Sequence, residues 1–135
     1  CGLEPVTWEA GQGHYPYQAT IDAYGDGGFR FAEMSHRGSL ICLPTGMFAW
    51  DVEAAADVTL ASLTRVIDSA DSIDVLLIGM GPDIAAIPPE IRTSLRERGV
   101  IVEAVSTGSA IRTYNVLLAE NRAVGAALIS VEKAR

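Results

Sequence analysis

The sequence predicts an α/β domain of three layers: a central mixed, largely parallel sheet, helices on both of its faces, and an added N-terminal β-hairpin. The first observation is a pair of mostly aliphatic runs, residues 75–78 and 100–105, which are typical of buried strands. The second is that a helical pattern follows each run, because successive strand–helix–strand units favour right-handed crossovers and parallel pairing. The third is a two-residue hydrophobic period before residue 50, which indicates hairpins.

Length and composition indicate one domain. The chain has 135 residues, 49% of them hydrophobic, which is enough for a core without disulfides or metals. We expect a single domain over residues 1–135, with an irregular segment at 1–18 and the α/β core at 19–131. The formal net charge of −7 argues against binding to nucleic acid or to an anionic membrane. No apolar stretch is long enough to span a bilayer, and we expect a cytoplasmic protein.

The N-terminal half contains the expected hairpin. Apolar and polar residues alternate there, and glycines and a proline separate the alternating runs. The elements we expect are strands at 19–24 and 29–31 around a turn at 25–28, a turn at 35–38, a strand at 39–43, and a strand-like aromatic run at 46–50 that extends or caps the sheet.

Beyond Trp50 the hydrophobic period lengthens to that of helices. The elements we expect are a helix capped by Asp57 and ending near Asp71, the central strand at 75–79, a helix that opens at 88–90 with Gly99 just past its end, a buried strand at 100–105, a helix at about 109–121 capped by Thr107, and a last strand at 123–131. The connection before the last strand is short. That suits a strand in the middle of the sheet, in a direction that the sequence does not fix.

The carboxyl ends of the two buried strands are where we expect a ligand, because they place residues 79–82 beside residues 106–109. The third helix begins there, and its free N–H groups attract anions. Arg112 adds positive charge to this positive helix end, which is unfavourable unless an anion or a buried carboxylate compensates it. The candidate anion- or ligand-binding residues are Gly79, Gly81, Thr107, Ser109, Arg112, Thr113 and Asn115.

A structural interpretation of the same residues stays open. The helix is apolar on most sides, so its polar side chains need partners inside the protein or from a ligand. In the structural interpretation, Arg112 pairs with an internal carboxylate such as Asp83 or Glu120, and Asn115 bonds to loop carbonyls.

Patterns for catalysis, metals and cofactors are weak. Gly79 and Gly81 lack the third glycine of a dinucleotide fingerprint, and Pro82 follows directly. His14 and His36 lie in separate segments. Cys42 lies in an apolar run that is typical of a buried thiol. Three acidic residues lie close together in the sequence but lack the spacing of a calcium loop: Asp68, Asp71 and Asp74. We therefore expect no catalytic residues, no metal and no cofactor, and the sequence does not favour an enzyme.

One segment carries a family resemblance. Residues 107–122 read Thr-Gly-Ser-Ala-Ile-Arg-Thr-Tyr-Asn-Val-Leu-Leu-Ala-Glu-Asn-Arg and follow Leu-Ile-Gly-Met-Gly at 77–81. Over about residues 21–131 the chain closely resembles the Mth938-type domain family. Its members include the mitochondrial complex I assembly factor three, the adipogenesis-associated domain protein and uncharacterised bacterial proteins. The resemblance implies a three-layer fold with a central mixed sheet, and no established catalytic activity.

The family's conspicuous block also maps onto Tyr114, Glu120 and Arg122, which we assign to a structural motif. Glu120 and Arg122 lie far along the helix from Thr107, where they could serve helix-to-strand packing. The chain departs from the family at two positions: Ile111 stands where many members have cysteine, and Asn121 where glycine is usual. With isoleucine at 111, the resemblance implies no thiol chemistry at the start of this helix.

Two functions follow as hypotheses. The first is a non-enzymatic accessory or assembly-factor-like protein of a bacterial cytoplasm, which binds an unknown protein partner through a surface near the third helix. Exposed aromatic side chains would anchor the partner, with Trp8, Tyr15 and Trp50 as candidates. The alternative is binding of a small anionic metabolite, with or without chemistry, in the crevice between Gly79–Gly81 and Thr107–Arg112. The partner, the ligand and the oligomeric state are not fixed by the sequence.

Overall fold

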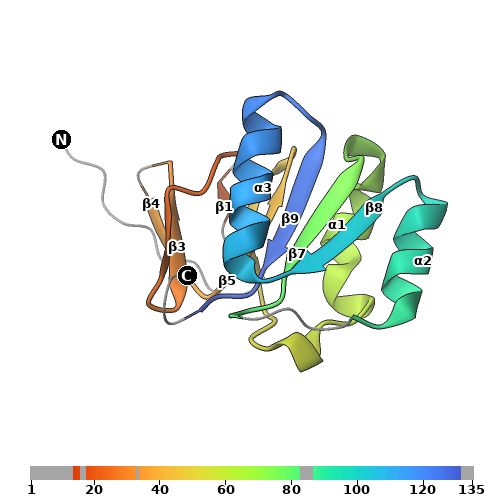
Figure 1. Ribbon diagram of the computed structural model, residues 1–135, viewed down its shortest axis with the longest axis horizontal. Helices are drawn as coiled ribbons and strands as arrows, with labels where there is room; N and C mark the ends of the chain where they lie inside the picture. Colours follow the sequence, from red (N-terminus) through yellow and green to blue (C-terminus); the bar gives the residue numbers. More distant parts are fainter. Residues whose placement is uncertain (1–13, 16–17, 33, 83–86, 132–135) are drawn as a thin grey trace.

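The computed structural model describes residues 14–15, 18–32, 34–82 and 87–131 (Figure 1). Their strands form two sheets, one of six strands in the order β1-β6-β5-β9-β7-β8 and one of three strands in the order β2-β3-β4. The strands are β1 (His14–Tyr15), β2 (Ala23–Gly25), β3 (Gly28–Phe31), β4 (Met34–Arg37), β5 (Ser39–Leu43), β6 (Gly46–Trp50), β7 (Val75–Gly79), β8 (Ile101–Val105) and β9 (Val124–Leu128). The α-helices are α1 (Thr64–Asp68), α2 (Pro89–Glu97) and α3 (Thr107–Ala119).

The predicted mixed sheet is confirmed, with β7 inside it. β7 pairs in parallel with β8 on one side and with β9 on the other. β5 pairs antiparallel with both β9 and β6, and β6 pairs antiparallel with β1. The parallel part is therefore limited to the three adjacent strands β9, β7 and β8. A tight turn at 44–45 joins β5 to β6 as an antiparallel hairpin. The last strand lies in the middle of the sheet, as its short connection predicts.

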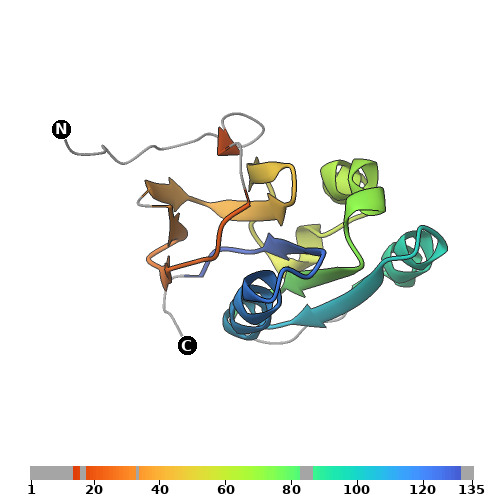
Figure 2. The ribbon, with the colours of Figure 1, turned by 90° about the horizontal axis from the view of Figure 1, so that it is seen from above.

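Helices cover both faces of this sheet, as expected (Figure 2). α3 lies on one face, where Ala110 and Tyr114 pack in one buried cluster with Leu77 of β7. α1 and α2 lie on the other face, where Val66 and Ile91 share a second cluster with neighbouring β7 side chains. This split follows from the alternation of side chains along a strand, since a strand without a polar face needs cover on both sides.

The three-stranded sheet packs on the same side as α3, at the opposite end of the molecule from α2 (Figure 1). Its β2–β3 pair is the predicted hairpin. The turn expected at 35–38 is wrong, because residues 34–37 form β4 and pair with β3. Phe29 and Phe31 join the buried cluster under α3, so the small sheet extends the core on this face.

Two further predictions need correction. Residues 101–105 do form a strand, but β8 is the edge of the sheet rather than a buried strand, and Ile101 is 65% exposed. The first predicted helix is broken into 3₁₀ turns at Ala55–Asp57, Ala61–Leu63 and Ala70–Ser72 around the short α1. Before α1, Thr59 and Ser62 each use their hydroxyl oxygen to accept the backbone N–H of the other, and such local bonds compete with helical ones.

The predicted irregular segment at 1–18 falls largely outside the described residues. Within it, β1 pairs with β6, and the Gln18 side chain donates a 2.6 Å hydrogen bond to the Val124 carbonyl. The predictions for Trp8 and for the Tyr15 side chain, and the pairing with Asp83, also lie outside what the structure describes. No helix among the described residues is long and apolar enough to cross a membrane.

Candidate functional site

The ends of the two parallel strands do lie side by side, where the sequence places the crevice. Gly79 at the end of β7 is in register with Val105 at the end of β8, and with Leu128 at the end of β9. α3 begins at the same place, with the Thr107 N–H donating a 2.8 Å hydrogen bond to the Gly81 carbonyl. Three strand ends and a helix start therefore meet at one point, which we call the strand-end junction.

Thr107 ties this junction together. Its side chain is fully buried, and its hydroxyl accepts from the Gly81 N–H at 3.0 Å and donates to the Ile129 carbonyl at 2.7 Å. The prediction that Thr107 caps α3 is wrong: Ser106 is the cap, and its hydroxyl accepts the Ser109 N–H at 3.3 Å. The Thr107 hydroxyl instead makes one bond to the chain after β7 and one to the chain after β9.

The glycines of the junction have different roles. A Cβ on Gly79 would lie 2.9 Å from both the Cα and the Oγ1 of Thr107, so the close approach of α3 to β7 requires glycine there. Gly81 has φ +105°, a backbone conformation that L side chains rarely adopt, while the space beside it is open. Both are buried.

Asn115 and Tyr114 hold the segment before β2 onto α3. The Asn115 side chain accepts the Ile21 N–H at 2.8 Å and donates to the Ile21 carbonyl at 2.9 Å. The fully buried Tyr114 hydroxyl donates to the Ala19 carbonyl at 2.6 Å. The structural interpretation of Asn115, a bond to a chain carbonyl, is thus confirmed.

Burial also shapes the acid–base properties of Tyr114 and its neighbour Cys42. Loss of hydration disfavours the charged form, so burial raises the pKa of the Cys42 thiol far above its usual range, against a smaller lowering effect of the Tyr114 hydrogen bond. The pKa of the Tyr114 hydroxyl is raised too, first by burial and then by the adjacent thiol. Both groups stay neutral at physiological pH, in agreement with the buried thiol expected from the sequence.

The remaining candidate residues are spread along α3. Arg112 and Thr113 are exposed, and the Arg112 guanidinium donates to the Ser109 hydroxyl at 3.3 Å in the first turns. Glu120 and Arg122 are exposed beyond the far end of the helix, so the structure does not bring them to the junction. Asn121 has φ +61° just after that end, where a left-handed residue is common.

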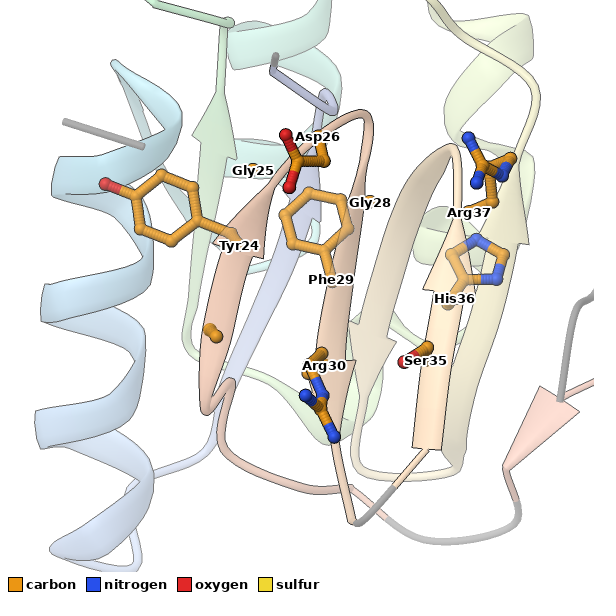
Figure 3. Close-up of a pocket in the computed structure, with 10 residues that line it drawn as sticks. Tyr24, Gly25, Asp26, Gly28, Phe29, Arg30, Ser35, His36 and Arg37 are labelled. Carbon is orange, nitrogen blue, oxygen red and sulfur yellow. The ribbon is translucent and has the colours of Figure 1, made fainter. Parts of the chain in front are cut away.

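A second concave region, which the sequence analysis missed, lies on the three-stranded sheet (Figure 3). This pocket has a volume of about 410 Å³ and is lined by residues of all three strands and of the turn between β2 and β3, among them Tyr24, Asp26, Arg30, Ser35 and Arg37. Recognising β4 as a strand would have revealed it, since alternation then puts Arg30 and Arg37 on one face. We call it the small-sheet pocket.

Residues 21–129 match the model of a protein family described as a protein of unknown function (DUF498/DUF598). The chain belongs to this family. It is 45% identical over 109 residues to an uncharacterised protein of Rhodobacter capsulatus, with 81% of this chain and 82% of that protein covered. It is 30% identical over 118 residues to mouse NADH dehydrogenase [ubiquinone] 1 alpha subcomplex assembly factor 3. That match covers 87% of this chain but 64% of the mouse protein.

Solved structures agree with this assignment. A Bartonella henselae protein described as an outer membrane protein is 50% identical and superposes with a TM-score of 0.85 over 88% of this chain and all of that one. A Bordetella pertussis protein described as a Mth938-like domain is 29% identical, with a TM-score of 0.75 over 86% of this chain and 87% of that one. The Mth938-type resemblance and its three-layer fold are therefore confirmed for this member of the DUF498 family.

Proposed function

We propose that this protein is a non-enzymatic accessory or assembly-factor-like protein that binds a protein partner through the surface formed by α3 and β8. The observation that carries the proposal is a pair of exposed aliphatic side chains on these two elements. Ile101 of β8 is 65% exposed and Val116 of α3 is 58% exposed. The similarity to proteins named as complex I assembly factors supports the same class of function.

The two side chains lie on the same side of the sheet. Val102 belongs to the buried cluster under α1 and α2, so its neighbour Ile101 points toward the α3 face. Ile101 is in register with Val75 at the start of β7, and Val75 with Val124, which closely follows α3. Val116 lies in the last turn of α3, so it is at the same end of the sheet as Ile101. Both side chains leave aliphatic area in contact with water, and a partner that covered this end of α3 and β8 would bury it.

The backbone of β8 offers a second means of binding. The Ile101 N–H donates to the Asp74 carbonyl, on the β7 side. Backbone groups alternate in direction along a strand, so the N–H and C=O groups of the next residue, Val102, point away from β7. The Arg92 side chain donates to the Val102 carbonyl and protects one outward group of this edge. A partner strand could pair with the rest of the edge, a recurring mode of peptide recognition.

One candidate anchor is removed from the proposal. Trp50 is 4% exposed, and its Nε1–H donates a 2.8 Å hydrogen bond to the Ser62 carbonyl. A side chain held in this way belongs to the core rather than to a docking surface. Ile101 and Val116 take the place of the aromatic anchors expected from the sequence.

A comparison of variants tests the proposal. Affinity-tagged wild type and the double variant Ile101→Asp/Val116→Asp are purified from the native host, and co-purifying proteins are quantified by mass spectrometry. Ala61→Asp, at an exposed position on the α1 side, is the matched control. We expect a stoichiometric partner with the wild type and the control but not with the double variant. Equal recovery of all proteins by the three baits would contradict the proposal.

The small anionic metabolite at the strand-end junction stays an alternative prediction. The Thr107 hydroxyl is committed to two backbone groups, so Ser109, Arg112 and the first N–H groups of α3 would have to hold the anion. With inorganic phosphate as the probe, Arg112→Ala should abolish a phosphate-dependent rise in melting temperature, while Arg96→Ala on α2 retains it. An unchanged rise in Arg112→Ala would contradict this alternative.

The cytoplasmic setting is likewise part of the proposal. It rests on the acidic net charge of −7 and on the absence of a long apolar run in the sequence. Fractionation of the native host, with the protein detected by immunoblotting, tests it directly. Recovery in the membrane pellet after a high-salt wash would contradict it.

A further inference from the structure

The small-sheet pocket places two arginines on one face. Along β3, Phe29 is buried and Arg30 exposed, and along β4, His36 is buried and Arg37 exposed. Arg30 is in register with Ser35, which lies two residues before Arg37, so the three side chains share the outer face of the sheet. Diagonal neighbours of this kind have their Cβ atoms roughly 7 Å apart. Figure 3 shows the two guanidinium groups toward opposite ends of the pocket.

The positive charge of these arginines is not compensated within the described part of the chain. Neither guanidinium makes a hydrogen bond or an ion pair with a described residue, although Asp26 lines the same pocket. This differs from Arg92, which donates to Val102, and Arg98, which donates to Ser94. Two like charges on one face of a three-stranded sheet repel each other, and an anion between them would remove that cost.

Two glycines line the pocket in the same cross-strand row as Arg37. Gly25 and Gly28 are cross-strand partners, and Arg37 is the next residue in the same row. A Cβ on Gly28 would lie 2.4 Å from the His36 carbonyl oxygen, so this position cannot carry a side chain without moving β4. The volume of about 410 Å³ is within the range of small-molecule sites.

We propose that the small-sheet pocket binds a small molecule with two oxyanion groups, one for Arg30 and one for Arg37. Each guanidinium is a planar fork that can hold a carboxylate or a phosphate through two parallel hydrogen bonds. The half-buried Ser35 lies opposite Arg30 and adds a hydroxyl donor. This site lies on a different sheet from the α3–β8 surface, so it does not depend on the proposed protein partner.

Thermal-shift titrations of the full chain test the proposal, with succinate as the dicarboxylate probe and pyrophosphate as the phosphate probe. Sodium chloride keeps the ionic strength constant, so that general screening does not contribute. We expect a saturable rise in melting temperature with at least one probe, and the stronger of the two identifies the oxyanion. The proposal is overturned if neither probe gives a saturable rise at concentrations up to about 10 mM, which is tenfold above a Kd of about 1 mM.

Charge-removing variants locate the site. Arg30→Gln and Arg37→Gln should each weaken the affinity for the probe at least tenfold. The double variant should show no probe-dependent rise in melting temperature, while the control Arg96→Gln retains the rise. Both arginines are exposed, and without probe at low salt the variants should melt at or above the wild-type temperature because repulsion is removed. Arg30→Lys/Arg37→Lys, which keeps the charge but loses the fork, should bind with intermediate strength. An unchanged response in the double glutamine variant would overturn the assignment.

Discussion

At the scale of single residues, the strand-end junction depends on one hydroxyl. Thr107 looks from the sequence like a helix cap, because a threonine before an apolar run usually is one. Its actual partners, Gly81 and Ile129, are distant in the sequence, so no local pattern could reveal them. The glycine at 79 could be singled out beforehand, but the reason for it, contact with Thr107, could not.

Thr107→Val tests this assignment. The variant keeps the shape of the side chain and leaves the Gly81 N–H and the Ile129 carbonyl buried without a partner. We expect the free energy of unfolding to fall by about 2–4 kcal/mol, measured by urea denaturation. Thr107→Ser, which keeps the hydroxyl, should recover most of this loss. The exposed control Thr113→Val should stay within about 0.5 kcal/mol of the wild type.

Cys42 leads to a prediction about pH. Because burial raises its pKa in the folded state, the thiol stays protonated there while the thiol of the unfolded chain ionises near its ordinary value. Above the pKa of the unfolded thiol, the unfolded state therefore binds fewer protons than the folded state. The contribution of Cys42 to the free energy of unfolding is fully present below that pKa and falls as the pH rises above it. We expect the Cys42 thiol to contribute a slope of up to about 1.4 kcal/mol per pH unit above pH 9, to which the buried Tyr114 hydroxyl adds only at higher pH. Cys42→Ala should show a shallower slope in urea denaturation, and identical slopes would contradict the prediction.

At the scale of elements, the sequence predicts best where one strand or helix carries its own signals. The aliphatic run of β7, the start of α2 at Pro89 and the glycine at 99 with φ +83° all agree with expectation. The polar residues of β4 resemble a turn, so the sequence does not predict this strand, although His36 points inward and is 3% exposed. The apolar run of β8 predicts a buried strand, because a sequence does not show how many neighbours a strand has in its sheet.

The attachment of α3 to the chain before β2 can be tested as a contact between elements. In Asn115→Ala the Ile21 N–H loses its acceptor, so its hydrogen exchange should accelerate at least tenfold. The amides in the middle of α3 should keep their wild-type exchange rates, since the helix does not use this side chain for its own hydrogen bonds. Thr113→Ala is the control. Unchanged exchange at Ile21 would show that Asn115 does not hold this segment.

At the scale of the whole molecule, the mixed three-layer architecture could be predicted, and the functional surface only in part. Membership of the DUF498 family fixes the fold, and its relatives include proteins named as assembly factors. The sequence pointed to α3, but it did not single out Ile101, because this residue is exposed only through the place of β8 at the edge of the sheet. Net charge and composition argued against nucleic acid, yet they contained no sign of the small-sheet pocket.

The most direct test of the proposed function is photo-crosslinking in the native host. The photoreactive amino acid p-benzoylphenylalanine replaces Ile101, Val116 or, as the control, Ala61. If the α3–β8 surface binds a protein partner, positions 101 and 116 should both crosslink to the same protein, and position 61 should not. Crosslinks to that protein from position 61 alone, or none from positions 101 and 116, would contradict the account.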